Sequence, residues 1–323
     1  MIYPWQQDAW NALSRARARD HMPHALLLAG PEYCGKRDFA LGLAKALMCE
    51  NAHGADDFAC GHCKSCHLFE ASSHPDYTSV LLEEKKTQIV VDQIRRLNEF
   101  VYLSRSYQES RVVFIYPVER LNTNAANSLL KTLEEPPKNT VMLLVSSNFS
   151  QLIPTIRSRC QIIQLPQPTT QQATDWLETQ DLTHPIGELL LASGGRPLLA
   201  KALDSGEKLA ERKQFATDIL KLLQGRHSLI SVAKRWEKSD KGELLDWQLQ
   251  WIESMIRSVF SGAEGVTDAI SPHLRKHMSL KNNDLWRLRD SMLELKKHAH
   301  TSLNALLYTE NMLLLWQKEA LNR

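Results

Sequence analysis

Short apolar runs alternate with helical patterns over the first half of the chain. The runs lie in "HALLLAG" (24–30), "SRVVFIYPV" (110–118), "TVMLLVSSN" (140–148) and "CQIIQLP" (160–166). They are rich in Val, Ile and Leu and show no polar alternation, which is typical of parallel strands buried on both faces. Helical patterns such as "KRDFALGLAKALMC" separate them. The pattern predicts an α/β, nucleotide-binding-like domain over residues 1–165.

After this region the strand patterns stop. "LPQPTTQQA" carries two prolines and several Thr and Gln residues and reads as a linker. Short helical patterns up to "ASGGRPLLAKAL" predict a small helical lid over residues 166–206. Longer patterns with apolar residues at three- and four-residue spacing predict an all-α domain over residues 207–323. Four positions of this last domain are expected to be buried, namely Trp247, Trp251, Ile256 and Phe260.

Composition and charge narrow the class of protein. The 323 residues are 43% hydrophobic and 24% charged, as in ordinary globular proteins, and suffice for two or three domains. The formal net charge of +2 gives no basic field over the whole molecule, so it neither indicates nor excludes a nucleic-acid partner. No apolar run is long enough to cross a membrane, and "MIYPWQQDAW" does not resemble a signal peptide. We expect no membrane association and a cytoplasmic location.

The stretch "GPEYCGKR" nearly matches a phosphate-binding loop. Gly30 and Gly35 would let backbone N–H groups approach phosphates, and Lys36 would reach the β and γ phosphates. Arg37, however, stands where a Ser or Thr would bind Mg²⁺. Two interpretations are open. The loop binds phosphate without magnesium, or it is only a strand-to-helix turn with Lys36 and Arg37 solvated.

The acidic residues that an active nucleotide site needs are also missing. In "RVVFIYPVERL" the two positions expected to hold Asp and Glu at the end of a strand are Tyr116 and Pro117. Glu119 lies nearby but is two residues out of register, which makes it a weak substitute. Two independent losses around one metal predict an ATPase fold without ATPase chemistry.

A cysteine cluster predicts a metal site. Cys49 is followed after ten residues by "CGHCKSC", which contains Cys60, Cys63 and Cys66. Two-residue gaps allow successive thiolates to turn toward one ion, and four thiolates make a closed, structural zinc site. An iron–sulfur cluster and unliganded thiols are the alternatives. The site is expected to fold a module at about residues 49–66, inserted after the first helix.

A family resemblance appears at "NAANSLLKTLEEPP" (124–137) and at "SRC" (158–160), where the sequence closely resembles bacterial clamp-loader subunits of the AAA+ class. The resemblance covers the first two predicted domains clearly. It implies an AAA+ fold with a RecA-like parallel sheet, an inserted zinc module, a helical lid and an all-α C-terminal collar domain for oligomerisation. The losses at Arg37, Tyr116 and Pro117 make the chain similar to the subunit of that complex that does not hydrolyse ATP.

The resemblance also assigns a role to Arg159. In this family the arginine of the Ser-Arg-Cys motif reaches the γ-phosphate in a neighbouring subunit, as an arginine finger in trans. It implies a hetero-oligomer with the clamp-loader ATPase (gamma/tau) and delta subunits of DNA polymerase III, and contact with the sliding clamp and primed DNA through that complex. The lid departs from the active members, because Leu198 in "GRPLLAKAL" occupies the position of their nucleotide-sensing arginine and Arg196 lies two positions away.

Two other functions compete with this one. A stand-alone AAA+ ATPase would show turnover by the isolated chain that depends on Lys36. A zinc-ribbon protein that binds nucleic acid would need a basic, aromatic surface around the cysteines. The sequence has basic and aromatic residues there but also two acidic ones, namely Lys64, His62, Phe58 and Phe69 with Asp56 and Asp57.

Overall fold

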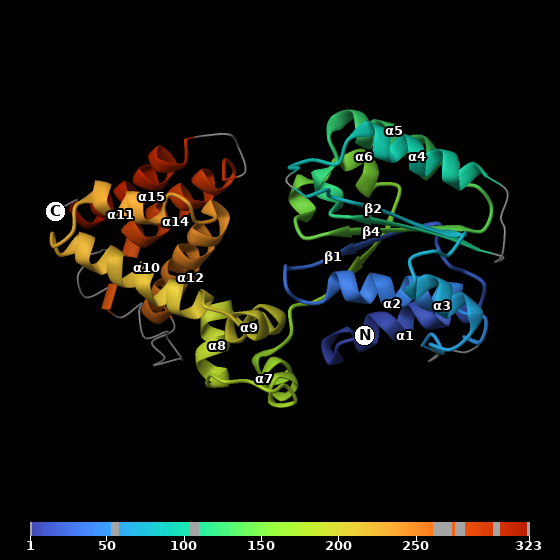
Figure 1. Ribbon diagram of the computed structural model, residues 1–323, viewed down its shortest axis with the longest axis horizontal. Helices are drawn as coiled ribbons and strands as arrows, with labels where there is room; N and C mark the ends of the chain where they lie inside the picture. Colours follow the sequence, from blue (N-terminus) through green and yellow to red (C-terminus); the bar gives the residue numbers. More distant parts are fainter. Residues whose placement is uncertain are drawn as a thin grey trace. The chain divides into compact units, whose positions relative to one another are not determined.

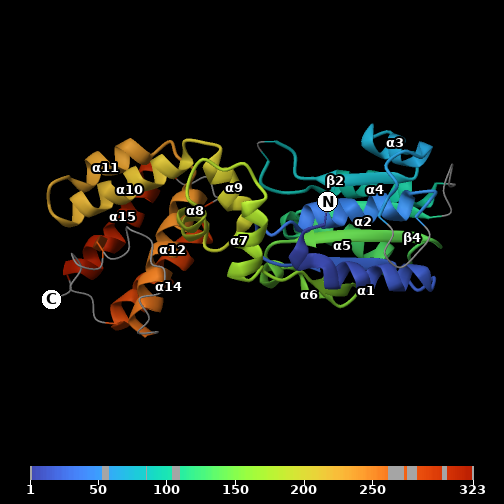
Figure 2. The same cartoon turned by 90° about the horizontal axis from the view of Figure 1, so that it is seen from below.

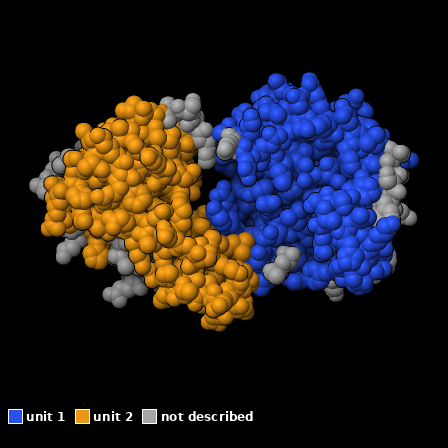
Figure 3. All heavy atoms as spheres, viewed as in Figure 1, with its two compact units in different colours: residues 1–172 blue, residues 173–323 orange. Residues whose placement is uncertain are grey.

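The computed structural model of the chain describes residues 2–52, 58–84, 86–103, 110–260, 273–274, 282–299 and 304–321. The chain forms two compact units, residues 1–172 and 173–323 (Figure 3). Each unit has its own apolar core.

The first unit is built on a parallel sheet. Its strands, in the spatial order β2-β3-β4-β1-β5, are β1 (Ala25–Ala29), β2 (Tyr77–Leu81), β3 (Arg111–Tyr116), β4 (Thr140–Ser146) and β5 (Gln161–Gln164). All four pairings are parallel. Every residue of the central strands β1 and β4 is buried, which explains their unbroken apolar runs.

Helices cover both faces of this sheet (Figures 1 and 2). On one face lie α1 (Gln7–Ala18), α2 (Lys36–Met48) and α3 (Lys64–Glu70), and on the other α4 (Val91–Tyr102), α5 (Thr123–Glu134) and α6 (Pro154–Arg157). Three-residue 3-10 helices occupy Pro4–Gln6, Val118–Arg120 and Phe149–Gln151. Trp10 and Phe39 belong to the core on the first face, and Ile94 and Leu129 to the core on the second.

The four strands predicted from apolar runs are confirmed, but several elements of the first unit were not predicted, among them β2 and α1. Strand β2 lies at the edge of the sheet, and its half-exposed sequence "YTSVL" contains no continuous apolar run. Helix α1 precedes the first strand and buries Trp10 and Leu13. The cysteine cluster begins directly after α2, which is the first helix that the sequence pattern predicted, at "KRDFALGLAKALMC".

The described residues of the second unit form helices and no strand. These are α7 (Thr170–Glu178, which begins just before the unit boundary), α8 (Ile186–Ser193), α9 (Pro197–Asp204), α10 (Lys208–Leu223), α11 (Leu229–Trp236), α12 (Lys241–Phe260), α14 (Asn282–Lys296) and α15 (Ala305–Leu321). One apolar cluster joins α7, α8, α9 and the start of α10, and a larger one joins the helices from α10 onward.

The larger cluster tests the predicted buried positions. Trp247, Trp251 and Ile256 are buried as predicted. The side chain of Phe260 lies outside what the structure describes. Among the described helices, none has the length and apolar character needed to cross a membrane.

Candidate functional site

The candidate phosphate loop joins β1 to α2, and packing alone requires both of its glycines. A Cβ atom on Gly30 would lie 2.3 Å from the carbonyl oxygen of Leu165. Gly35 has a φ of +83° at the N-cap of α2, and a Cβ there would lie 2.3 Å from the ring of Tyr3. The glycine spacing is therefore explained by this chain's own fold and is not by itself a sign of phosphate binding.

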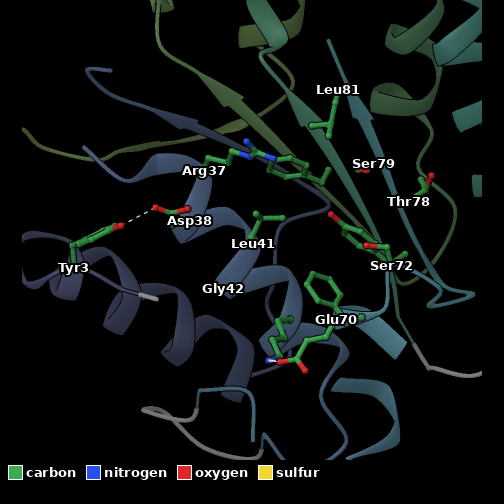
Figure 4. Close-up of a pocket in the computed structure, with 14 residues that line it drawn as sticks. Tyr3, Arg37, Asp38, Leu41, Gly42, Glu70, Ser72, Thr78, Ser79 and Leu81 are labelled. Atoms are coloured by element: carbon green, nitrogen blue, oxygen red, sulfur yellow. Dashed lines mark hydrogen bonds and ion pairs between the residues drawn. The ribbon is translucent and has the colours of Figure 1, made fainter. Parts of the chain in front are cut away.

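The N-terminal residues hold the loop from one side. The indole N–H of Trp5 and the side-chain amide of Gln6 both donate to the carbonyl oxygen of Cys34, at 3.0 and 2.9 Å. The Tyr3 hydroxyl donates to Asp38 in the first turn of α2 at 2.8 Å (Figure 4). Burial, together with the carboxylate of Asp38, raises the pKa of Tyr3. Sequence analysis did not single out these residues, because their role depends on a contact with a loop some thirty positions away.

Lys36 is folded into the loop. Its side chain is only 5% exposed, and its ammonium group donates to the carbonyl oxygen of Pro31 at 2.5 Å. Burial lowers the pKa of Lys36, while the charges of Glu32 and Glu119 act in the opposite direction. The expectation of a solvated Lys36 in a simple turn is wrong, although Arg37 is exposed as that interpretation required.

At the place where an active nucleotide site would hold Mg²⁺, this chain has a contact between Arg37 and Tyr116. The guanidinium of Arg37 lies 5.9 Å from the ring centroid of Tyr116, within the range of a cation–π contact. Arg37 stands at the hydroxyl position and Tyr116 at an acidic position of an active site. Glu119 accepts a hydrogen bond from the backbone N–H of Ser147 at 3.0 Å, which engages one of its two carboxylate oxygens. The arrangement contains no oxygen ligand set for Mg²⁺ among these residues.

The four cysteines meet at one point. The Sγ atoms of Cys49, Cys60, Cys63 and Cys66 all lie within 4.8 Å of one another. The Cys49–Cys63 distance is 3.9 Å and the Cys60–Cys66 distance is 4.0 Å between sulfur atoms. A tetrahedron with metal–sulfur bonds of about 2.3 Å has edges of about 3.8 Å. The cluster therefore has the size to hold a metal ion with four thiolate ligands.

Backbone donors surround these sulfur atoms. The N–H groups of Cys60, Cys63 and Cys66 each donate to the sulfur of another cysteine of the cluster, at 3.3 to 3.4 Å. Such bonds favour the thiolate form that binds metals. The backbone N–H of His62, followed by that of Cys63, lowers the pKa of Cys60 to about 6, whereas burial raises the pKa of Cys66 to about 12.

Arg159 follows α6 and contacts the end of α5. Its guanidinium is ion-paired with Glu134 and donates to the carbonyl oxygen of Thr155 at 2.9 Å. Both charged side chains remain partly exposed. Arg157, two residues earlier, lies instead over the ring of Phe149 at 5.0 Å. The two arginines of the motif thus have different surroundings, and Arg159 is the one held by a carboxylate.

The topology separates Arg159 from the chain's own phosphate loop. Arg159 precedes β5, whereas the loop follows β1, and these two neighbouring strands are parallel with Leu26 opposite Gln161. The arginine and the loop therefore lie at opposite ends of the strands, and the four residues of β5 alone span about 13 Å. Within one chain, Arg159 does not lie beside the loop of Gly30, Gly35 and Lys36.

Comparisons with known proteins identify the family. A family model described as "DNA polymerase III, delta subunit" matches residues 5–169. The delta' subunit of DNA polymerase III from Pseudomonas aeruginosa is 35% identical, with 98% of this chain and 97% of that protein covered. The chain belongs to the DNA polymerase III delta' family. Its relative from Haemophilus influenzae is 33% identical over 79% of this chain and 77% of that protein.

A solved structure supports the fold of this family member. A gamma subunit-related protein of DNA polymerase III from Thermotoga maritima aligns over 96% of this chain and 99% of that one, with a TM-score of 0.50 and 19% identity. At that identity the likeness concerns the fold alone.

The segment predicted to be a lid contains Arg196 and Leu198, whose surroundings differ. Arg196 forms the N-cap of α9, and its Nε donates to the carbonyl oxygen of Ser193 at 2.8 Å. Leu198, at the position where the sensing arginine was expected, is partly buried in α9. Arg196 is thus engaged in a local backbone contact, and the side chain two positions later carries no charge.

Proposed function

We propose that this chain is the non-hydrolysing delta' subunit of a DNA polymerase III clamp loader, which loads the sliding clamp onto primed DNA. In this proposal it supplies Arg159 in trans to the ATP site of a neighbouring ATPase subunit. The observation that carries it is the position of Arg159 at the opposite end of the sheet from the chain's own phosphate loop. A partly exposed guanidinium so placed can be reached by another subunit, and an arginine finger contributes roughly 10³ to 10⁵ in rate.

The loss of hydrolysis in this chain is supported by three side chains. Arg37 and Tyr116 contact each other where a hydroxyl and a carboxylate would hold Mg²⁺, and Pro117 occupies the second acidic position. The loop formed by Gly30, Gly35 and Lys36 is then a remnant of a nucleotide site. The ammonium group of Lys36 donates a hydrogen bond to the carbonyl oxygen of Pro31 in the same chain, and not to a phosphate.

The tetrahedral size of the cysteine cluster favours zinc as its metal. Four thiolates leave no open coordination position, so the ion would be structural. One zinc ion per chain, bound by Cys49, Cys60, Cys63 and Cys66, would fold the segment between α2 and β2.

The partners in this proposal are the gamma/tau ATPase and delta subunits, with the sliding clamp and primed DNA reached through the complex in the cytoplasm. Residues 166–206 would act as a lid and residues 207–323 as an oligomerising collar. Leu307 and Leu314 of α15 are 64% and 52% exposed and lie seven residues apart on one face of the helix. Such an exposed apolar pair suits a collar contact.

The test compares ATP hydrolysis by the purified chain alone with hydrolysis by its mixture with the ATPase and delta subunits, the clamp and primed DNA. We expect no turnover alone and strong turnover in the mixture. Arg159→Ala should strongly reduce the turnover of the mixture without preventing assembly. Arg157→Ala, which removes the neighbouring arginine that lies over Phe149, is the matched control and should retain it. Turnover by the isolated chain that is lost in Lys36→Ala would instead show an active ATPase.

A further inference from the structure

Strand β2 is an open edge of the sheet. It pairs with β3 on one side and is the last strand in the order β2-β3-β4-β1-β5. Its sequence, Tyr-Thr-Ser-Val-Leu, favours extended structure and contains no proline or charged residue. Those are the residues by which proteins usually protect an exposed edge from further pairing.

The backbone of Ser79 faces the open side. The carbonyl of Asp76 and the N–H of Leu82 bond to β3, so the even-numbered residues of this strand face β3 and Tyr77, Ser79 and Leu81 face outward. The outward N–H of Tyr77 donates to His74, and the outward carbonyl of Leu81 accepts from Gln93. In the part of the chain that the structure describes, no residue pairs with the outward N–H and C=O of Ser79.

A hollow lies on each face of this edge. The larger, of about 800 Å³, lies between β2, α2 and α3 (Figure 4). Its apolar wall includes Leu41, Phe69, Tyr77 and Leu81. The smaller, of about 300 Å³, lies on the opposite face and is lined by Thr78, Ser79, Val80, Gln93, Arg96 and Leu97. Thr78 and Ser79 line both hollows, so the two spaces flank the same point of the edge.

The charges differ between the two hollows. In the larger one, Lys45 is paired with Glu70 at 2.5 Å, Asp38 accepts from Tyr3, and Arg37 lies over Tyr116. In the smaller one, Arg96 carries the charge, and within the described residues no hydrogen bond or ion pair engages its exposed guanidinium. An apolar side chain in the larger hollow would contact its apolar wall, whereas the guanidinium of Arg96 in the smaller one suits a carboxylate.

Successive side chains of a strand point to opposite faces of a sheet. We propose that β2 accepts an extended segment of a partner protein as a sixth strand, which pairs with Ser79, inserts an apolar side chain beside Leu41 and presents a carboxylate to Arg96. The partner is thus recognised by a short alternating apolar and acidic sequence, through the β-strand addition that many peptide-binding domains use. This surface is independent of Arg159 and of the proposed clamp-loader role.

Pairing with a second copy of the chain is disfavoured by charge. Two antiparallel β2 strands would be related by a two-fold axis perpendicular to the joint sheet, so both Arg96 side chains would lie on the same face close to that axis. Like charges at such an interface are unfavourable. A hetero-partner with a carboxylate at the corresponding position has the complementary charge.

The probe is a random dodecapeptide library displayed on filamentous phage and selected against the full-length chain. We expect enrichment of peptides that alternate apolar residues with Asp or Glu. A synthetic version of such a peptide should slow amide hydrogen exchange in residues 77–81. Ser79→Pro removes the outward N–H at a position where an edge strand tolerates proline, and it should abolish binding.

Arg96→Glu tests the charge and should weaken binding roughly tenfold or more. Arg95→Glu is its matched control, because Arg95 is the adjacent residue of α4 and is paired with Asp92 rather than lining the hollow. We expect unchanged binding in this control. Enriched peptides whose binding survives Arg96→Glu, a selection that enriches no acidic alternating peptide, or self-association of the chain through β2 would each overturn the proposal.

Discussion

Arg159 and Glu134 form an ion pair between the end of α5 and the motif that precedes β5. Both residues belong to the segments that carry the family resemblance. If Arg159 acts on a neighbour's phosphate, its guanidinium must either leave the Glu134 carboxylate when the complex assembles or contact the carboxylate and the phosphate together. The Glu134 carboxylate therefore competes with the phosphate for the Arg159 guanidinium. Breaking this ion pair reduces the free energy gained when the complex assembles.

Glu134→Gln should consequently ease the release of Arg159. A partly exposed pair of this kind contributes about 0.2–1 kcal/mol, so the concentration of this chain needed for half-maximal ATPase stimulation should fall by up to about fivefold at low salt. Glu135→Gln, at the exposed neighbouring position, is the control. Weaker stimulation in Glu134→Gln would mean that Glu134 orients Arg159 for its task instead of competing for it.

The contact between Arg37 and Tyr116 leads to a prediction about magnesium. Because neither side chain can ligate the ion as a hydroxyl or carboxylate would, ADP should bind the isolated chain equally well, or equally poorly, with Mg²⁺ or with EDTA. The double substitution Arg37→Thr with Tyr116→Asp restores one ligand on each side and should make any ADP binding magnesium-dependent, by about tenfold. Calorimetric titration measures both constants. Tighter ADP binding to the wild type in the presence of Mg²⁺ would contradict the prediction.

The cysteine cluster predicts a metal-dependent fold of its module. Undenatured protein should contain one zinc ion per chain, and Cys60→Ser should lose most of it because a tetrahedral site then lacks one ligand. Cys34→Ser changes a buried thiol outside the cluster and should retain the ion. Metal analysis, combined with limited proteolysis between α2 and β2, distinguishes these outcomes. Iron and sulfide in the wild-type protein would instead indicate an iron–sulfur cluster.

The sequence predicted those features that depend on neighbouring residues. The buried strands appear as apolar runs, and the cysteine spacing indicated four sulfur atoms around one point. Features that depend on contacts distant in sequence were not predicted. The burial of Lys36 and the bonds from Trp5 and Gln6 to the loop follow from how the N-terminus packs. The edge strand β2 was missed for a different reason, since its half-exposed residues lack a continuous apolar pattern.

The burial of Lys36 should make the free energy of unfolding depend measurably on pH. Burial lowers its pKa in the folded chain below the ordinary value of 10.5. At pH values between the folded and the unfolded pKa of Lys36, the unfolded chain binds one more proton than the folded chain. The free energy of unfolding therefore increases as the pH rises through this range. Below the range Lys36 is buried as a charged group, and the cost to stability is greatest.

Lys36→Met should therefore be at least as stable as the wild type at pH 7, and the difference in stability in its favour should shrink as the pH approaches 10.5. Denaturant unfolding of both proteins at several pH values measures the difference, with Lys64→Met, at an exposed lysine of α3, as the control. A large loss of stability in Lys36→Met at pH 7 would mean that the hydrogen bond to Pro31 outweighs the cost of burial.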